Sequence, residues 1–205
     1  MIILITASFA FAEWRFEKQY KQEVRENMKL PYSNSVVTYE SMAHLPDPVK
    51  RYLIYTGAID QPFPKNFTIK FEGQIRQDEK SDWMPFTSEQ YNFIERPTRL
   101  FFMKAKMKGL AVAGYHAFKN GTATMDIRVL SLFPVQYQDG PEMNQSETVT
   151  WFNDVCLFAP GALIDDRITW EAIDDLTAKA TFSNEGIIIS AILNFNERGE
   201  LTNFI

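Results

Sequence analysis

Alternation of apolar and polar side chains along residues 66–132 constrains the fold of this chain more than any other feature. In the first stretch, Phe67, Ile69 and Phe71 alternate with Thr, Lys and Glu. A period of two residues is typical of strands that bury one face. The sequence therefore predicts strands over residues 66–75, 83–94, 100–106, 110–118 and 122–132. Because every connection between them is short, we expect consecutive strands to pair antiparallel.

A second series of alternating stretches follows nearer the C-terminus. It predicts strands over residues 168–173, 176–182, 187–195 and 200–205. Ile188 and Ile192 add apolar groups to the second face of the third of these strands, so we expect it to be covered on both sides. In the first series, the Asn120-Gly121 dipeptide is a strong signal for a tight hairpin turn. The chain ends inside the last predicted strand, and we expect the natural protein to continue.

A helix is predicted over residues 144–158, between the two series of strands. Asn144 and Glu147 are spaced as a capping pair at its start, and the proline at position 160 forbids its continuation. The apolar residues at helical spacing are Val149, Phe152 and Cys156. A shorter helix is predicted over residues 45–57, where prolines stand at the start and a glycine at the end. We expect the longer helix to cover an open sheet or to plug a half-closed barrel.

The first twelve residues, MIILITASFAFA, form an uninterrupted apolar run. This run is shorter than the roughly 20 residues that span a bilayer. Three interpretations compete: the remnant of a membrane anchor, a degenerate signal sequence, or a buried helix. The first two are favoured and place the protein in the cell envelope, membrane-associated or extracytoplasmic. Residues 13–28 predict a charged helix, either a juxtamembrane stalk or a solvated surface helix. The expected organisation is a segment over residues 1–29 and one β-rich domain over residues 30–205.

Composition excludes some classes of function. The net charge is −5 and no cluster of Lys and Arg stands out, which argues against nucleic-acid binding. Aromatic residues make up 14% of the chain, which suits a well-filled β-rich core or, alternatively, an apolar cavity. The single cysteine, Cys156, lies on the apolar side of the predicted helix, so we expect it to be a small buried side chain.

No motif for a known catalytic or cofactor site is present. The chain lacks a glycine-rich phosphate loop, a CxxC pair, an HExxH motif and a G-x-S-x-G elbow. The two histidines, His44 and His116, fall in different predicted elements, so we expect no zinc site. Glu171, Asp174 and Asp175 are interpreted as turn residues rather than as ligands of a hard cation. We therefore expect no cofactor, no metal and no catalytic residue.

Two groups of residues are the candidates for ligand binding. The first is a polar set on the predicted helix, which either lines a pocket mouth or only caps and solvates the helix: Glu147, Asn153 and Asp154, with Trp151 beside them. The second is an apolar set expected on the concave face of the sheet: Phe101, Met103, Met125 and Ile127. An apolar wall with a few polar groups at its edge is the usual construction of a small-molecule site.

Several stretches resemble an uncharacterised bacterial family of unknown function, whose members are often preceded by membrane segments. They are LPDPVKRYLIYTG, TRLFFMKAKMKGLAVAGYHAFKNGTATM, SETVTWFNDVCLFAPGALID running into ITWEAID, and NFNERGELTNF. The resemblance covers most of residues 45–205 and implies no catalytic residues. More distantly, a strand meander with covering helices is similar to the open half-barrel of LolA- and LolB-type lipoprotein carriers, an architectural likeness that does not establish function.

The sequence as a whole predicts an α+β fold, a curved antiparallel sheet or unclosed barrel with covering helices. The leading functional hypothesis is an envelope-associated, non-enzymatic domain that binds a lipid or other apolar ligand between sheet and helix. One alternative is a hydrolase-like enzyme that uses Glu147, Asp154 and His116. Another is a structural or interaction domain with a solid core. The expected partners are a lipid or apolar small molecule and, through the N-terminus, a membrane, but no nucleic acid.

Overall fold

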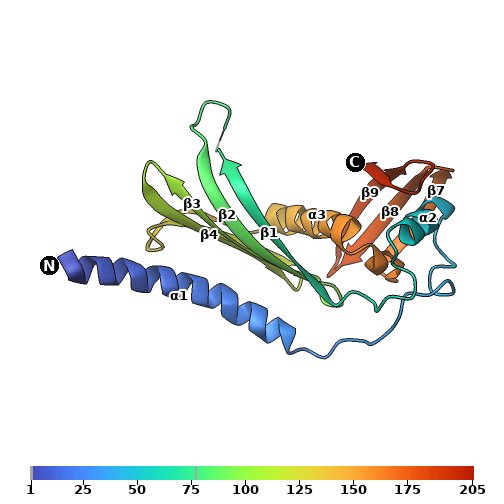
Figure 1. The fold of residues 1–205 in the computed structure, drawn as a ribbon, viewed down its shortest axis with the longest axis horizontal. Helices are drawn as coiled ribbons and strands as arrows, with labels where there is room; N and C mark the ends of the chain where they lie inside the picture. The colour runs from blue at the N-terminus through green and yellow to red at the C-terminus, as the bar shows by residue number, and fades with distance from the viewer. Residues whose placement is uncertain (1, 77) are drawn as a thin grey trace. The chain divides into compact units, whose positions relative to one another are not determined.

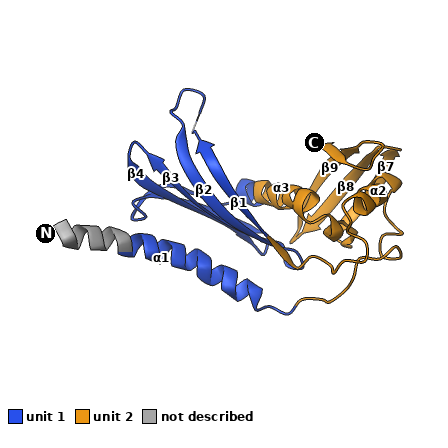
Figure 2. Cartoon of the chain, in the orientation of Figure 1, with its two compact units in different colours: residues 1–31, 68–144 blue, residues 32–67, 145–205 orange. Residues whose placement is uncertain are grey.

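The computed structural model describes residues 2–76 and 78–205, and for Ile2–Ala10 it describes the backbone alone. The chain forms two compact units (Figure 2). Unit 1 comprises residues 1–31 and 68–144, and unit 2 comprises residues 32–67 and 145–205. Each unit combines helix with antiparallel sheet, so the predicted α+β class is confirmed.

Unit 1 is built on a six-stranded sheet, whose strands lie in the order in which they occur along the chain. The strands are β1 (Asn66–Ile75), β2 (Met84–Phe93), β3 (Thr98–Met107), β4 (Leu110–Lys119), β5 (Thr122–Val129) and β6 (Phe133–Gln138). Every pair of neighbours whose register is given is antiparallel. Because β1 and β6 remain as two edges, the sheet does not close. The prediction of an open antiparallel sheet is therefore confirmed, and an interpretation of this sheet as a β-barrel is wrong, because the sheet is not closed.

The register of the central strands assigns their side chains to two faces. Phe102 of β3 lies opposite Tyr115 of β4, and Tyr115 lies opposite Asp126 of β5. Side chains that face one another across antiparallel strands project from the same side of the sheet. The residues that alternate with these three project from the other side. Edge strand β1 departs from the half-buried pattern that was predicted, because its residues 70–75 are all exposed.

Both ends of strand β5 are tight turns. Asn120 and Gly121 have φ angles of 52° and 68°, which confirms the predicted hairpin turn between β4 and β5. At its other end β5 stops at Val129, earlier than predicted, because Leu130 and Ser131 adopt φ angles of 52° and 56°. Strand β6 was not predicted. Its Pro134 and a register shift against β5 interrupt the alternation that marks the other strands.

One helix, α1 (Ile2–Met28), packs along one face of this sheet (Figure 1). The predicted boundary between residues 12 and 13 is absent, because the helix continues through it. Its buried side chains recur every four residues and form a single stripe: Ala12, Phe16, Tyr20 and Val24. Phe16 and Tyr20 contact Phe102, with ring centroids 5.6 Å and 5.4 Å apart. Trp14, by contrast, lies outside this stripe and is 54% exposed.

The anchor and signal-sequence interpretations of residues 1–12 depend mainly on the side chains of residues 1–10, which lie outside those that the structure describes. No helix in the described part of the chain is both long enough and apolar enough to cross a membrane. The membrane association of the N-terminus therefore remains a prediction.

Unit 2 is built on a four-stranded antiparallel sheet in the order β10-β9-β8-β7. The strands are β7 (Ile168–Asp174), β8 (Thr177–Asn184), β9 (Ile187–Phe195) and β10 (Leu201–Phe204). Its helical segments are α2 (Asp47–Tyr55), the 3-10 helix η1 (Pro160–Ile164) and α3 (Pro141–Phe158), whose first turn belongs to unit 1. The four strands of this sheet, together with α2 and α3, were each predicted within three residues of their observed ends.

The sheet of unit 2 has one buried face and one exposed face. In β8, Ala178, Ala180 and Phe182 are buried and alternate with more exposed residues. The same alternation runs through β9, where Ile188 is 65% exposed and Ile192 is 37% exposed. The prediction that β9 is covered on both sides is therefore wrong, and the two isoleucines lie on the solvent face.

Helix α3 supplies two of the aromatic side chains in the core of unit 2. Trp151 and Phe152 both stack on Phe182, with ring centroids 5.1 Å and 5.4 Å apart. Val149, expected on the apolar face, is 37% exposed, because the buried face is rotated onto residues 147, 148, 151, 152, 155 and 156. Cys156 is buried, as predicted, and the hydroxyl of Tyr52 donates a hydrogen bond to its carbonyl oxygen at 2.7 Å.

The helix also begins earlier than predicted. Its first residue is Pro141, a favourable first position because proline has no N–H to leave unbonded. Asn144 is inside the first turn, where its Oδ1 accepts a hydrogen bond at 2.7 Å from the backbone N–H of Ala123 in β5. Asn144 is therefore not the cap of α3, and Glu147, which is 6% exposed, is part of its buried face.

Candidate functional site

The eight residues predicted to bind a ligand are divided between the two units. Phe101, Met103, Met125 and Ile127 belong to the sheet of unit 1. Glu147, Trp151, Asn153 and Asp154 belong to the part of α3 that lies in unit 2.

The structure brings the four apolar residues together on the sheet face opposite α1. Phe101 and Met125 flank His116 of β4 in register, and Met103 and Ile127 flank Gly114. A Cβ atom at Gly114 would lie 2.9 Å from Cγ of Met103, so the absence of a side chain there allows Met103 and Ile127 to close over β4. All four are half-buried. Methionine adapts its shape easily, which suits a surface that accepts variable apolar groups.

The four residues of α3 have unequal environments. Trp151 is 2% exposed and belongs to the core through its contact with Phe182. Glu147 is buried, whereas Asn153 and Asp154 are half-buried. Glu147 and Asp154 are seven residues apart, which places them about 10 Å apart along the helix axis. This spacing is too long for the two carboxyl groups to share a proton directly.

The structure gathers no metal site from the residues singled out in the sequence. Within the described part of the chain, no three His, Cys, Asp or Glu side chains are placed to hold a metal ion. Asp174 accepts a hydrogen bond from the backbone N–H of Leu176 at 2.8 Å, as expected for a turn residue. His116 belongs to unit 1 and packs edge-on against Phe101, with centroids 5.4 Å apart. Glu147 and Asp154 belong to unit 2.

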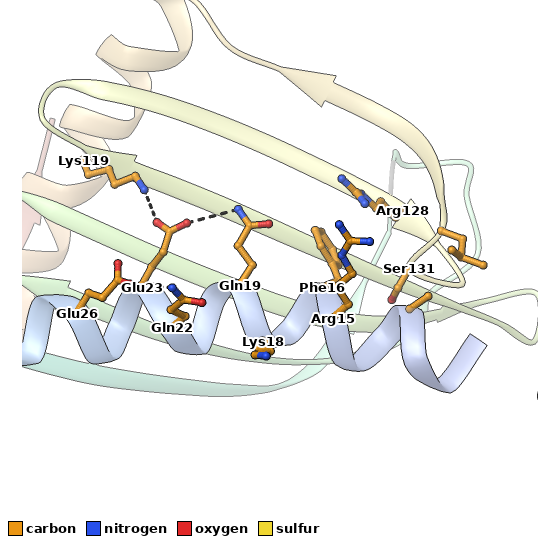
Figure 3. A pocket seen from close by; sticks show the side chains of 12 residues that line it. Arg15, Phe16, Lys18, Gln19, Gln22, Glu23, Glu26, Lys119, Arg128 and Ser131 are labelled. Atoms are coloured by element: carbon orange, nitrogen blue, oxygen red, sulfur yellow. Dashed lines mark hydrogen bonds and ion pairs between the residues drawn. The ribbon is translucent and has the colours of Figure 1, made fainter. Parts of the chain in front are cut away.

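A groove runs alongside α1 in unit 1. A helix about 10 Å wide cannot cover six strands, since strands about 4.8 Å apart span roughly 24 Å. On the side of β4 and β5, the uncovered strip forms a groove of about 710 Å³ (Figure 3). Its lining residues are Ala12, Arg15, Phe16, Lys18, Gln19, Gln22, Glu23 and Glu26 of α1, with Lys119, Arg128, Ser131 and Leu132 from the sheet and its turns. This volume lies in the range of small-molecule sites.

One end of the groove combines an apolar floor with two guanidinium groups. Arg128 lies 4.7 Å from the ring centroid of Phe16, and it forms hydrogen bonds of 2.6–3.0 Å to the carboxylate of Asp126. These bonds use Nε and Nη2, which leaves Nη1 to donate elsewhere. Arg15 lines the same groove and forms no ion pair with any residue that the structure describes. Two oriented guanidinium groups beside an aromatic ring are suited to an anionic group with an apolar attachment.

The other end of the groove is closed by an internal ion pair. Lys119 of β4 binds the carboxylate of Glu23, which also accepts a hydrogen bond of 3.4 Å from Gln19 (Figure 3). Beneath them the hydroxyl of Tyr115 is buried close to the carboxylate of Glu23. Burial and the nearby charge of Glu23 raise the pKa of Tyr115. The charges at this end are thus largely matched, in contrast to Arg15 at the first end.

The opposite side of α1 is held to the sheet by ion pairs. Lys104 of β3 binds Glu13 at 3.1 Å and Glu17 at 2.6 Å. Partial burial alone would raise the pKa of Glu17, but its bonds to Lys104 and Lys21 lower it below the usual range. The hydroxyl of Tyr20 donates a hydrogen bond of 3.1 Å to the carboxylate of Glu89. These contacts fix the position of α1 and therefore the width of the groove.

The residues of this groove were not among the predicted ones. The stripe of Phe16 and Tyr20 at four-residue spacing was a usable signal that residues 13–28 bury one face. Asp126 and Arg128 are two residues apart in a predicted strand, so their position on a common face could also be predicted from the sequence. The position of Arg15 beside Arg128 carries no sequence signal, because it depends on how α1 crosses the sheet.

A sequence model of DUF6544, a family of unknown function, matches residues 35–205. The predicted resemblance to a family of unknown function is thereby confirmed. No curated protein and no solved structure matches the chain. The similarity to LolA- and LolB-type carriers accordingly stays a prediction. Helix α1 precedes the matched residues, whereas all six strands of the sheet of unit 1 lie within them.

Proposed function

Because the chain belongs to DUF6544, a family of unknown function, we propose a function from the geometry of unit 1: it binds a lipid-like ligand, without catalysis, in the groove between α1 and the six-stranded sheet. The observation that carries this proposal is the end of the groove where Arg15 and Arg128 flank the ring of Phe16. An anionic head group would bind the two guanidinium groups, and its apolar part would lie against Phe16, Ala12 and Leu132.

The charge distribution favours an anionic ligand over a neutral one. The protein has a net charge of −5, yet the groove is lined by four cationic side chains and two acidic ones, Glu23 and Glu26. Asp126 offsets one of the cations, and Glu23 is already bound to Lys119. The unmatched positive charge is therefore at the Arg15 end. A carboxylate or phosphate there gains charge-assisted hydrogen bonds of about 1.5–3 kcal/mol each.

The proposed location is the cell envelope. Residues 1–12 contain no charged side chain, and from Ile2 on they belong to α1, whose residues Ala12, Arg15 and Phe16 line the groove. A ligand drawn from a membrane would therefore reach the cationic end of the groove near the apolar end of the helix. The run is too short to span a bilayer by itself, so association at the interface is the form that it favours.

The opposite face of the same sheet is a second candidate surface. Phe101, Met103, Met125 and Ile127 meet there around Gly114, and they are only half-buried. This face supplies apolar contact and offers His116 as a polar group beside Phe101. It would suit a neutral apolar ligand better than an anion. The two faces therefore predict different ligand chemistry, which an experiment can separate.

Binding of a fluorescent fatty acid tests the proposal. Wild-type protein should take up the probe, and Arg15→Gln should weaken binding about tenfold, or about 1.4 kcal/mol, because one charge-assisted contact is lost. Arg25→Gln is the matched control: Arg25 is an exposed arginine of the same helix that does not line the groove, so its replacement should leave affinity unchanged. The methyl ester of the probe should bind more weakly and should not distinguish wild type from Arg15→Gln.

Other outcomes would locate or dismiss the ligand. Weakening by Met125→Gln but not by Arg15→Gln would place the ligand on the face that carries Phe101. Glu147→Ala and Asp154→Ala should bind the probe within a factor of about three of wild type, a difference below 1 kcal/mol, since α3 lines neither surface in this proposal. Absence of uptake by the wild type would dismiss binding of lipid-like anions by this domain.

A further inference from the structure

One end of unit 1 exposes large apolar side chains from three separate segments. This apolar end consists of Phe11 and Trp14 of α1, Met107 and Leu110 at the β3–β4 turn, and Leu132 and Phe133 at the β5–β6 turn. Their exposed fractions lie between 37% and 59%. Apolar side chains clustered on a surface mark sites of interaction more often than single ones do.

Contacts within unit 1 place these segments beside one another. The backbone N–H of Leu130 donates a hydrogen bond of 2.8 Å to the carbonyl oxygen of Ala111, which joins the β5–β6 turn to the start of β4. Ala12 of α1 lines the same groove as Leu132. A second cavity, of about 480 Å³, is lined together by Glu13, Lys106, Ala111 and Ser131. The start of α1 and the two turns therefore form one end of the unit.

Tight turns hold the side chains of this end outward. Lys108 and Gly109 connect β3 to β4 with φ angles of 50° and 84°. Leu130, Ser131 and Leu132 connect β5 to β6, and the first two are likewise in the left-handed region. Hairpin connections of two or three residues are compact. Since the backbone is already ordered, little further entropy is lost when these tips meet a partner.

Basic residues surround the apolar end. Lys106 and Lys108 lie in the β3–β4 hairpin and are exposed, as is Arg15 of α1. Lys18 lies 4.5 Å from the ring centroid of Trp14. Glu13, an acidic residue beside them, is paired with Lys104. The local charge is therefore positive in a chain whose net charge is −5.

We infer that this apolar end docks on an anionic membrane surface, with the two turns and the side chains of Phe11 and Trp14 inserted among the lipid head groups. Apolar and aromatic side chains with Lys and Arg around them are the composition of interfacial membrane contacts. The end also continues from residues 1–12, which carry no charge. Apolar tips on separate turns fit a fluid lipid surface better than they fit a rigid protein groove.

This inference goes beyond the proposed ligand groove and can be tested apart from it. Leu110 and Phe133 belong to the apolar end but do not line the groove. The full chain is mixed with phosphatidylcholine vesicles, with or without phosphatidylglycerol, and the bound fraction is measured by flotation. Wild type should bind the anionic vesicles more tightly. The double variant Leu110→Glu with Phe133→Glu should bind them more weakly by more than about tenfold, because two apolar side chains no longer insert.

The control is a pair of equally exposed residues in unit 2. Ile173 and Ile188 are 50% and 65% exposed, and the double variant Ile173→Glu with Ile188→Glu should bind vesicles like wild type. Replacement of Lys106 and Lys108 by Gln should weaken binding to anionic vesicles about fivefold per charge and should not affect neutral ones. Circular dichroism verifies that each variant is folded.

Two results would overturn the inference. Equal vesicle binding by wild type and Leu110→Glu with Phe133→Glu would show that the turns do not contact lipid, whatever the N-terminal run does. A dimer in wild type that Leu110→Glu with Phe133→Glu abolishes in the absence of vesicles would instead make this end an interface between two copies. Fatty-acid uptake by the same variant is measured in parallel and should be unchanged, so that failure of docking is distinguished from failure of the groove.

Discussion

The two units solve the same packing problem with different proportions of helix and sheet. Unit 2 has four strands, and α2, α3 and η1 belong to it, so that β8 and β9 each present one continuously buried face. Unit 1 has six strands, and α1 is its one complete helix within the described residues. Its face under α1 is buried along a central strip, whereas the flanks remain open as grooves.

The difference shows that coverage, rather than composition, separates a solid core from a surface with room for a ligand. Both units use aromatic stacking: Trp151 and Phe152 on Phe182 in one, and Tyr20 on Phe102 in the other. In unit 2 the aromatic contacts are enclosed. In unit 1 the same kind of contact is a ridge with a groove on either side, because one helix is narrower than the sheet.

The largest expected effect is in the core of unit 2. Phe152→Ala should lower the free energy of unfolding by about 3–5 kcal/mol, because the side chain is fully buried against Phe182. Phe71→Ala is the matched change in unit 1, where the side chain is 45% exposed on edge strand β1, and it should cost less than about 1 kcal/mol. Urea denaturation measures both. Equal losses would contradict the contrast between an enclosed core and an open sheet.

A smaller effect is expected at the turn that joins β4 to β5. Gly121→Val should destabilise unit 1 by more than about 1 kcal/mol, since its φ of 68° is strained for a β-branched residue. The denaturation midpoint reports the change. Val→Ala substitution at Val135, an exposed residue of β6, serves as a control for loss of β-propensity. An unchanged midpoint for Gly121→Val would mean that this turn does not limit the stability of the six-stranded sheet.

Acid should weaken the attachment of α1 before it affects the core of unit 2. The lowered pKa of Glu17 means that its ion pair with Lys104 stabilises the folded state fully above the unfolded pKa, about 4.3, and that this contribution is lost as pH falls through the folded pKa. The effect should be under about 1 kcal/mol, because the pair is partly exposed. Hydrogen exchange of α1 between neutral pH and pH about 3 measures it. Glu17→Gln should show less pH dependence in this range.

The smallest effect is expected from shortening the N-terminus. Removal of residues 1–11 takes away Phe11, which is 59% exposed, and stops before the buried stripe that starts at Ala12. Both units should keep their cooperative unfolding, and the shortened protein should be more soluble. Loss of a cooperative transition for unit 1 would show that the apolar run contributes to its core, as the third interpretation of that run requires.

Local pattern predicted the elements better than it predicted their burial. Nine of the strands follow from alternation, and the Asn120-Gly121 turn from its dipeptide, because both signals act between neighbours in sequence. Strand β6 was not predicted, because Pro134 and a register shift interrupt its alternation of apolar and polar side chains. The exposure of Ile188 and the burial of Glu147 depend on which segments cover a face. No local pattern contains that information.

The candidate site was predicted in part for the same reason. Phe101 and Met103 lie two apart on one strand, so their common face could be read from the sequence. The groove beside α1 requires the crossing of a helix and a sheet that are some 70 residues or more apart along the chain. The sequence predicts the helix over residues 13–28, but it does not predict the strands against which this helix packs. The positions of the groove residues Arg15 and Arg128 depend on that packing.

The buried thiol of Cys156 can report how often unit 2 opens. It is the single cysteine of the sequence, it is 1% exposed, and burial raises its pKa, so that it cannot be modified in the closed state. A thiol reagent must wait for α3 to open, and its rate of incorporation counts those openings. Unit 1 contains no cysteine. The labelling kinetics of the unaltered protein therefore report the opening of unit 2 alone, even under conditions of acid or lipid that act on unit 1.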